Sequence, residues 1–175
     1  RISAYGSLAA ARLRCGEIAQ AWEAAEAAAQ LISSIPVPFA HRLLEGYAGI
    51  AEVYLTLWER GDAPSATTNQ TTLRQMARQA CQWLHAYARV FPIGRPRTWL
   101  WQGVYEWLDD RPSRAFKAWR RGVIMATRLH MPYEQALVHY ELGRHSAGTY
   151  RQHHLQKAAE LFTQLGTTYD IQRTG

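Results

Sequence analysis

The spacing of large and small residues over positions 99–126 constrains the fold of this chain more than any other feature. Gly103 lies four positions after a tryptophan, and beyond a break at 110–112 Trp119 stands four positions after Ala115 and three before Gly122. Small residues at helical spacing let two backbones approach each other, and large aromatic side chains fill the space that remains. The segment therefore predicts two antiparallel helices that nest against each other.

An apolar period of 3.6 residues recurs along the whole chain, and almost no segment alternates in the way that a strand does. We predict four helix pairs, at about 2–33, 39–90, 97–130 and 133–165. A polar loop at 61–69 expands the second pair. Gly166 is expected to end the last long helix in the left-handed conformation that glycine adopts readily.

Single residues predict several boundaries. Pro36 and Pro38 are expected to end the first pair, because proline lacks an amide donor and disfavours helix in the residue before it. Ser113, preceded by a proline, is predicted to be an N-cap. Residues 91–96 are predicted to close the second pair, and residues 148–150 are predicted to form a loop. The apolar residues of the helix near 39–60 are predicted to share one broad stripe: Leu43, Leu44, Tyr47, Ile50, Ala51, Tyr54 and Trp58.

The repeat unit of about 34 residues matches the period of tetratricopeptide repeats. Two positions depart from that pattern, since Glu106 stands where a tyrosine is expected and Ala25 replaces the large aromatic of the first repeat. We predict an all-α fold, an antiparallel helix-pair solenoid of tetratricopeptide type with about four pairs. It is expected to form a single helical-repeat domain over residues 1–175.

Composition excludes several classes of protein. Of the 175 residues, 47% are hydrophobic and 19% are charged, which suits a folded domain with a continuous core. No stretch approaches the roughly 20 apolar residues that cross a bilayer, so no membrane span is predicted. Cys15 and Cys81 form no Cys-x-x-Cys unit, which favours a reduced, cytoplasmic setting. The first residues lack the layout of a signal peptide, and we expect a fragment of a longer protein.

Two further segments carry a family resemblance. Residues 131–145 read MPYEQALVHYELGRH, and residues 154–162 read HLQKAAELF and run on to Leu165 and Gly166. Together they resemble the C-terminal helical-repeat region of large bacterial signalling proteins, in which an NTPase module is joined to a nucleotide cyclase or a Ser/Thr protein kinase. The resemblance covers about residues 99–173. It implies a regulatory or interaction role, with the chemistry in other domains, and neither a phosphate loop nor a paired-aspartate metal site occurs in this sequence.

Four histidines raise the question of a metal site: His139, His145, His153 and His154. Metal ligands on one helix stand three or four residues apart so that both imidazoles face the same ion, and none of these pairs has that spacing. A site assembled across helices stays open as the alternative. We interpret the four as surface or packing histidines, and we predict neither a metal nor a cofactor.

The acidic residues predict no catalytic centre. Asp109 and Asp110 could act as paired carboxylates, but adjacent acids in a turn are more typical of helix ends. Glu134 and Glu141 share a helix face, and Arg144 three residues further on allows an ion pair within the helix. No nucleophile elbow or Ser, His and Asp arrangement stands out, so no catalytic residue is predicted.

Basic and aromatic residues give the candidate binding surface. Arg114, Lys117, Arg121 and Arg128 recur at intervals of three, four and seven and so line one helix face. Such a stripe could hold an acidic peptide or a phosphate, or it could be only the solvated side of the helix. The aromatic residues at 99, 101, 105 and 107 cannot all face one way, and those that do not pack inward could line a concave groove. Trp101 and Tyr105 are therefore added to the partner-binding candidates.

Two functional hypotheses remain. The first is a non-catalytic interaction or regulatory module of a bacterial signalling protein, which binds a protein or peptide segment, or another domain of its parent chain. The formal net charge of +6 favours an acidic partner. The alternative is a helical-repeat nucleic-acid-binding module that uses its basic face, which the inequality of the repeats disfavours. An enzyme is disfavoured because no convergent polar site appears.

Overall fold

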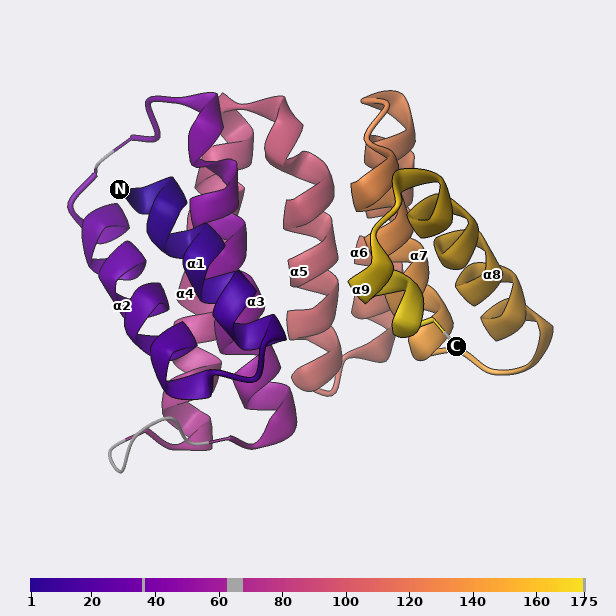
Figure 1. Ribbon diagram of the computed structural model, residues 1–175, viewed down its shortest axis with the longest axis horizontal. Helices are drawn as coiled ribbons and strands as arrows, with labels where there is room; N and C mark the ends of the chain where they lie inside the picture. Colours follow the sequence, from indigo (N-terminus) through magenta and orange to yellow (C-terminus); the bar gives the residue numbers. More distant parts are fainter. Residues whose placement is uncertain (36, 63–67, 175) are drawn as a thin grey trace. The chain divides into compact units, whose positions relative to one another are not determined.

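The computed structural model describes residues 1–35, 37–62 and 68–174, and every regular element in these ranges is a helix (Figure 1). The chain divides into two compact units, Arg1–Gly94 and Arg95–Gly175. The first unit contains α1 (Ile2–Arg14), α2 (Ile18–Ser33), η1 (His41–Leu43), α3 (Leu44–Arg60), α4 (Gln70–Val90) and η2 (Pro92–Gly94). The second contains α5 (Arg95–Leu108), α6 (Pro112–Arg128), α7 (Pro132–Arg144), α8 (Gly148–Leu165) and α9 (Thr168–Gln172).

The predicted all-α, antiparallel helix-pair fold is confirmed. Within the units the pairs are α1 with α2, α3 with α4, α5 with α6, and α7 with α8, and each helix packs against its neighbours in sequence order. Short connections account for the antiparallel pairing of α1 with α2, α5 with α6 and α7 with α8. The pairs follow the predicted boundaries closely, because the apolar period and the breakers between helices are both local signals.

Helix α3 is the central element of the first unit. It packs against α1, α2 and α4, and its residues from Leu44 to Leu57 are buried apart from Glu45, which is exposed, and Thr56, which is half-buried. The residues of the predicted stripe are buried apart from the half-buried Trp58, but burial also extends beyond the stripe, to Ala48 and Val53 among others. A helix with neighbours on three sides has little exposed surface in its middle, so even Glu52 is only 8% exposed.

Glycines let α1 and α3 cross at close range. A Cβ atom added to Gly49 would lie 2.1 Å from the carbonyl oxygen of Gly6, and one added to Gly6 would lie 2.4 Å from the Cα of Gly46. Both distances are far inside van der Waals contact, and both are to backbone atoms that cannot move aside. Glycine is therefore required here for want of space, despite its cost in a helix interior.

The nested pair predicted over residues 99–126 is present as α5 and α6. Trp119 is fully buried, and its indole Nε1 donates a hydrogen bond to the carbonyl oxygen of Leu100 at 3.2 Å. A Cβ atom on Gly103 would lie 2.2 Å from that nitrogen. Gly122 faces Val138 of α7, where an added Cβ would lie 3.0 Å from a methyl group. The small residues thus make room for one large aromatic ring and for the next helix.

Two predicted boundaries in the second unit need correction. Arg111, and not Ser113, occupies the N-cap position of α6, and Pro112 is the first helical residue, where its missing amide donor costs nothing. Residues 148–150 are the first turn of α8 rather than a loop, with Ala147 at the N-cap. Gly148 has a positive φ of 61° at this first position, a conformation that glycine adopts without strain.

The second pair differs from the prediction at its start and in the segment that follows it, while α4 ends at Val90 as predicted. Its first long helix, α3, begins at Leu44 after the short helix η1, and Arg95 with Pro96 belongs to α5 rather than to the closing segment. Asn69 caps α4, its side-chain oxygen accepting from the amide of Thr72 at 2.9 Å. Gly166 ends α8 with a φ of 69°, as predicted. Pro36 and residues 63–67 of the predicted polar loop lie outside the described residues.

Candidate functional site

Helix α6 has a buried face and an exposed basic face. Its buried residues, among them Trp119 and Gly122, pack inside the second unit. At 100° per residue, the basic side chains fall within an arc of about 120° on the opposite side. They are Arg114, Lys117, Arg120, Arg121 and Arg128, all of them exposed. The structure thus places the four predicted basic residues on one accessible face, here called the α6 basic face, together with Arg120.

No carboxylate neutralises the α6 basic face. Helix α6 contains no Asp or Glu, and across the described part of the chain none of its five basic residues has an ion-pair partner. Some basic residues elsewhere do have partners, as in the pairs of Arg14 with Glu52 at 3.1 Å and Arg144 with Glu141 at 2.9 Å. Five positive charges therefore point to solvent from one helix.

The α6 basic face also contains an apolar side chain. Ile124 is 50% exposed, with Arg120 and Arg121 one turn before it and Arg128 one turn after it. The guanidinium of Arg121 lies 4.9 Å from the centre of the Trp99 ring on α5, a cation–π contact that fixes its position. An exposed isoleucine among arginines suits a ligand that combines negative charge with an apolar group.

The helix dipole adds to the positive potential at one end of this face. Arg114 lies in the first turn of α6, where the free amide groups already carry a partial positive charge and where no acidic residue is present. Arg111, at the N-cap, is neutralised by Asp109 and by Glu106, whose carboxylate lies 3.1 Å from its Nε. Arg114 has no such partner within the described residues and stands exposed.

The two aromatic candidates lie differently from the basic residues. Tyr105 is 6% exposed and contacts the guanidinium of Arg111, 5.9 Å from its ring centre. Trp101 is half-buried, as are Trp99 and Trp107. Tyr105 thus offers little surface to a partner, and the part of Trp101 and Tyr105 in binding stays a prediction.

Polar side chains inside the second unit tie α7 to its neighbours. Arg97 on α5 and Glu134 on α7 form an ion pair of 3.2 Å, and both side chains are buried. The predicted pair of Glu141 with Arg144 is confirmed at 2.9 Å, and His145 lies 3.3 Å from the same carboxylate. Burial alone would raise the pKa of Glu141, but the hydrogen bond from His145 and the charge of Arg144 lower it overall. These groups contact one another, and their contacts stabilise the packing of the second unit.

Two histidines that are 15 positions apart in the sequence, His139 and His154, lie side by side in the structure. The Nδ1 atoms of His139 on α7 and His154 on α8 lie 2.7 Å apart, and both rings are buried. A search for ligands along one helix cannot find this pair, because it forms across two. Burial and the positive charges of His154, His153 and Lys157 lower the pKa of His139 to about 4. Over the described residues, no group of three or more His, Cys, Asp or Glu side chains is placed to hold a metal ion.

The helices of the described segments include none with both the length and the apolar character needed to cross a bilayer. Comparison with known proteins gives no match to a family model, to a curated protein or to a solved structure.

Proposed function

We propose that this chain is a non-catalytic interaction module that binds an acidic segment of a protein through the α6 basic face. The observation that carries the proposal is the set of five exposed basic residues without an ion-pair partner in the described part of the chain. The resemblance noted in the sequence supports another domain of a bacterial signalling protein as the source of that segment.

The chemistry of the face favours a peptide over a bare anion. Arginine and lysine side chains spaced along about four turns of α6 would pair with carboxylates at similar spacing on a partner helix or strand. Ile124 would contact an apolar side chain between those carboxylates. Because the cations are exposed, they would act mainly by steering association and fixing register, while the apolar contact would add affinity.

A peptide-binding measurement tests the proposal. The probe is a short fluorescein-labelled peptide of glutamates with a central leucine, followed by fluorescence anisotropy with the full chain. The double variant Arg114→Glu and Lys117→Glu should weaken binding by about tenfold or more. Glutamate at position 114 suits the positive end of the helix dipole, so a loss of binding would not come from unfolding of α6.

The matched control places the same charge change on another helix. Arg78 and Arg89 are exposed residues of α4, and the variant Arg78→Glu with Arg89→Glu alters net charge by the same amount. If both double variants weaken binding equally, the effect is one of overall charge and the α6 site is rejected. A labelled single-stranded RNA that binds more tightly than the peptide, with affinity falling steeply with salt, would instead support nucleic-acid binding.

A further inference from the structure

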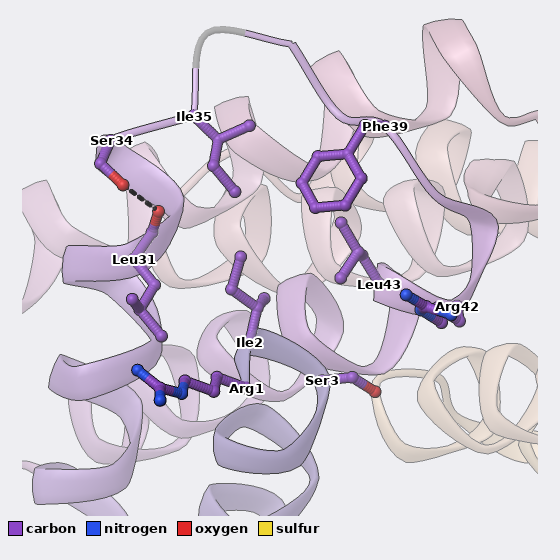
Figure 2. Close-up of a pocket in the computed structure, with 9 residues that line it drawn as sticks. All are labelled: Arg1, Ile2, Ser3, Leu31, Ser34, Ile35, Phe39, Arg42 and Leu43. Atoms are coloured by element: carbon purple, nitrogen blue, oxygen red, sulfur yellow. Dashed lines mark hydrogen bonds between the residues drawn. The ribbon is translucent and has the colours of Figure 1, made fainter.

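The first unit contains an open cavity of about 290 Å³ between the start of α1, the end of α2 and the short helix η1 (Figure 2). Its apolar lining comes from all three of these elements and from the segment before η1. The lining residues of this kind are Ile2, Leu31, Ile35, Phe39 and Leu43. Arg1, Ser3, Ser34 and Arg42 complete the wall, and no acidic residue is among the lining residues.

The cavity is large enough for one bulky side chain. An apolar cavity of about 150 Å³ holds a benzene molecule, so this space accommodates an aromatic side chain together with part of its backbone. Figure 2 shows the side chains of Ile35, Phe39 and Ile2 around this space. Phe39 is 66% exposed, which is unusual for a phenylalanine beside an apolar cavity and leaves its ring available to a ligand.

The polar part of the wall is positively charged. Arg1 and Arg42 are exposed, and within the described residues neither has an ion-pair partner. Figure 2 shows them on opposite sides of the cavity. The hydroxyl of Ser34 already donates to the carbonyl oxygen of Leu31 at 2.7 Å, so the guanidinium groups are the principal free donors. A ligand that fits this wall carries negative charge beside its apolar group.

We infer that this cavity is a second binding site, which takes one aromatic side chain of an acidic segment of a protein partner. Phe39 and the aliphatic residues would surround the inserted ring, while Arg1 and Arg42 would pair with carboxylates next to it in the partner sequence. The site lies in a different unit from the α6 basic face and does not depend on it. The chain thus has two binding sites for acidic segments. The α6 basic face would recognise carboxylates, and the cavity of the first unit would recognise an aromatic side chain beside carboxylates.

The test uses two labelled peptides, one with a tryptophan flanked by glutamates and aspartates and one with serine in place of the tryptophan. Binding to the full chain is followed by anisotropy. The tryptophan peptide should bind about tenfold or more tightly than the serine peptide. Phe39→Ser should remove most of that difference in affinity. Arg42→Glu should weaken binding of the tryptophan peptide about fivefold or more. Both residues are exposed, so neither variant should unfold the unit.

Matched controls are Val90→Ser, an exposed apolar residue on α4, and Arg78→Glu on the same helix. Equal binding of the two peptides, or unchanged binding by Phe39→Ser and Arg42→Glu, would overturn the inference. So would self-association of the chain that Phe39→Ser abolishes, since the cavity would then take a second copy. The variant Arg114→Glu with Lys117→Glu separates the two sites. The tryptophan peptide should still bind this variant more tightly than the serine peptide does, whatever the outcome of the test of the α6 basic face.

Discussion

In the first unit, α1 and α3 cross with the backbones of Gly6 and Gly49 in contact, whereas in the second unit a buried ion pair and a histidine pair join α7 to α5 and α8. The first unit also has ionic contacts, but its pair of Arg14 with Glu52 is open to solvent, with 28% of the arginine side chain exposed. The corresponding figure for Arg97 in the second unit is 5%.

The two units therefore obtain the same helix-pair architecture from contacts with different physical requirements. A crossing of backbones at glycine needs only the absence of Cβ atoms, and it is insensitive to pH and salt. A buried ionic or imidazole contact is stable only while each group keeps its partner and its protonation state. Changes in one kind of contact should leave the other unit unaffected, and this expectation gives ways to test the comparison.

The largest effect is expected at the buried ion pair of the second unit. Arg97→Met leaves the carboxylate of Glu134, which is 8% exposed, without its partner in the fold. Breaking such a pair by removing one side costs about 3–5 kcal/mol, because a buried charge then stands uncompensated. Urea unfolding monitored by circular dichroism measures the loss.

The double variant Arg97→Met with Glu134→Met is the control for this prediction. Replacing both charged groups by apolar ones of similar size removes the desolvation cost along with the attraction, so most of the stability should return. A double variant as unstable as Arg97→Met alone would show that packing of the arginine, including its contact with the Tyr133 ring at 5.4 Å, matters more than its charge.

A smaller but still large effect is expected where backbones cross in the first unit. Gly49→Ala places a Cβ 2.1 Å from the carbonyl oxygen of Gly6, so the two helices must separate. Overpacking of this kind should cost about 2–3 kcal/mol even after the higher helix propensity of alanine is included. Gly122→Ala in the second unit meets only side-chain atoms, of which the nearest is a methyl group of Val138 at 3.0 Å, and should change the free energy of unfolding by less than about 1 kcal/mol. Equal costs at the two glycines would remove the distinction between backbone and side-chain contacts.

The parts of the fold that the sequence predicts well depend on local signals. The nesting of α5 and α6 around Trp119 follows from spacing within one hairpin, and the end of α8 follows from one glycine. Boundaries failed where a residue had two possible roles. Ser113 is a good N-cap by type, but the proline before it is better placed as the first helical residue, and this shifts the cap to Arg111.

Contacts between helices distant in sequence were missed for a physical reason. No partner was predicted for Glu134, because nothing in the spacing of residues points to Arg97, 37 positions earlier. The crossing at Gly6 and Gly49 could have been predicted from the sequence. Glycine destabilises a helix interior, so glycines inside predicted helices indicate that another backbone approaches closely. The basic residues of α6 were predictable from periodicity alone, but their lack of ion-pair partners within the described residues required the structure.

The smallest of the three expected losses of stability concerns pH and the histidine pair of the second unit. The pKa of His139 is lowered from 6.5 to about 4 in the fold, by burial and by the charges of His154, His153 and Lys157, and burial also lowers the pKa of His154. Below pH 6.5 the unfolded chain therefore binds protons that the folded chain resists, so acid favours unfolding. The free energy of unfolding should fall by about 1–2 kcal/mol between pH 7 and pH 5, and the contribution of His139 should be fully lost once the pH falls through its folded pKa.

The control for pH exploits the difference between the units. His139→Gln removes one titrating group at the contact with His154 and should flatten the dependence of urea midpoint on pH. His41→Gln alters an exposed histidine of the first unit, whose side chain takes no part in the crossing of α1 with α3, and should leave the slope unchanged. A slope that survives His139→Gln would place the acid sensitivity outside the pair. A slope that disappears with His139→Gln would show that the buried imidazole pair sets the response of the second unit to acid.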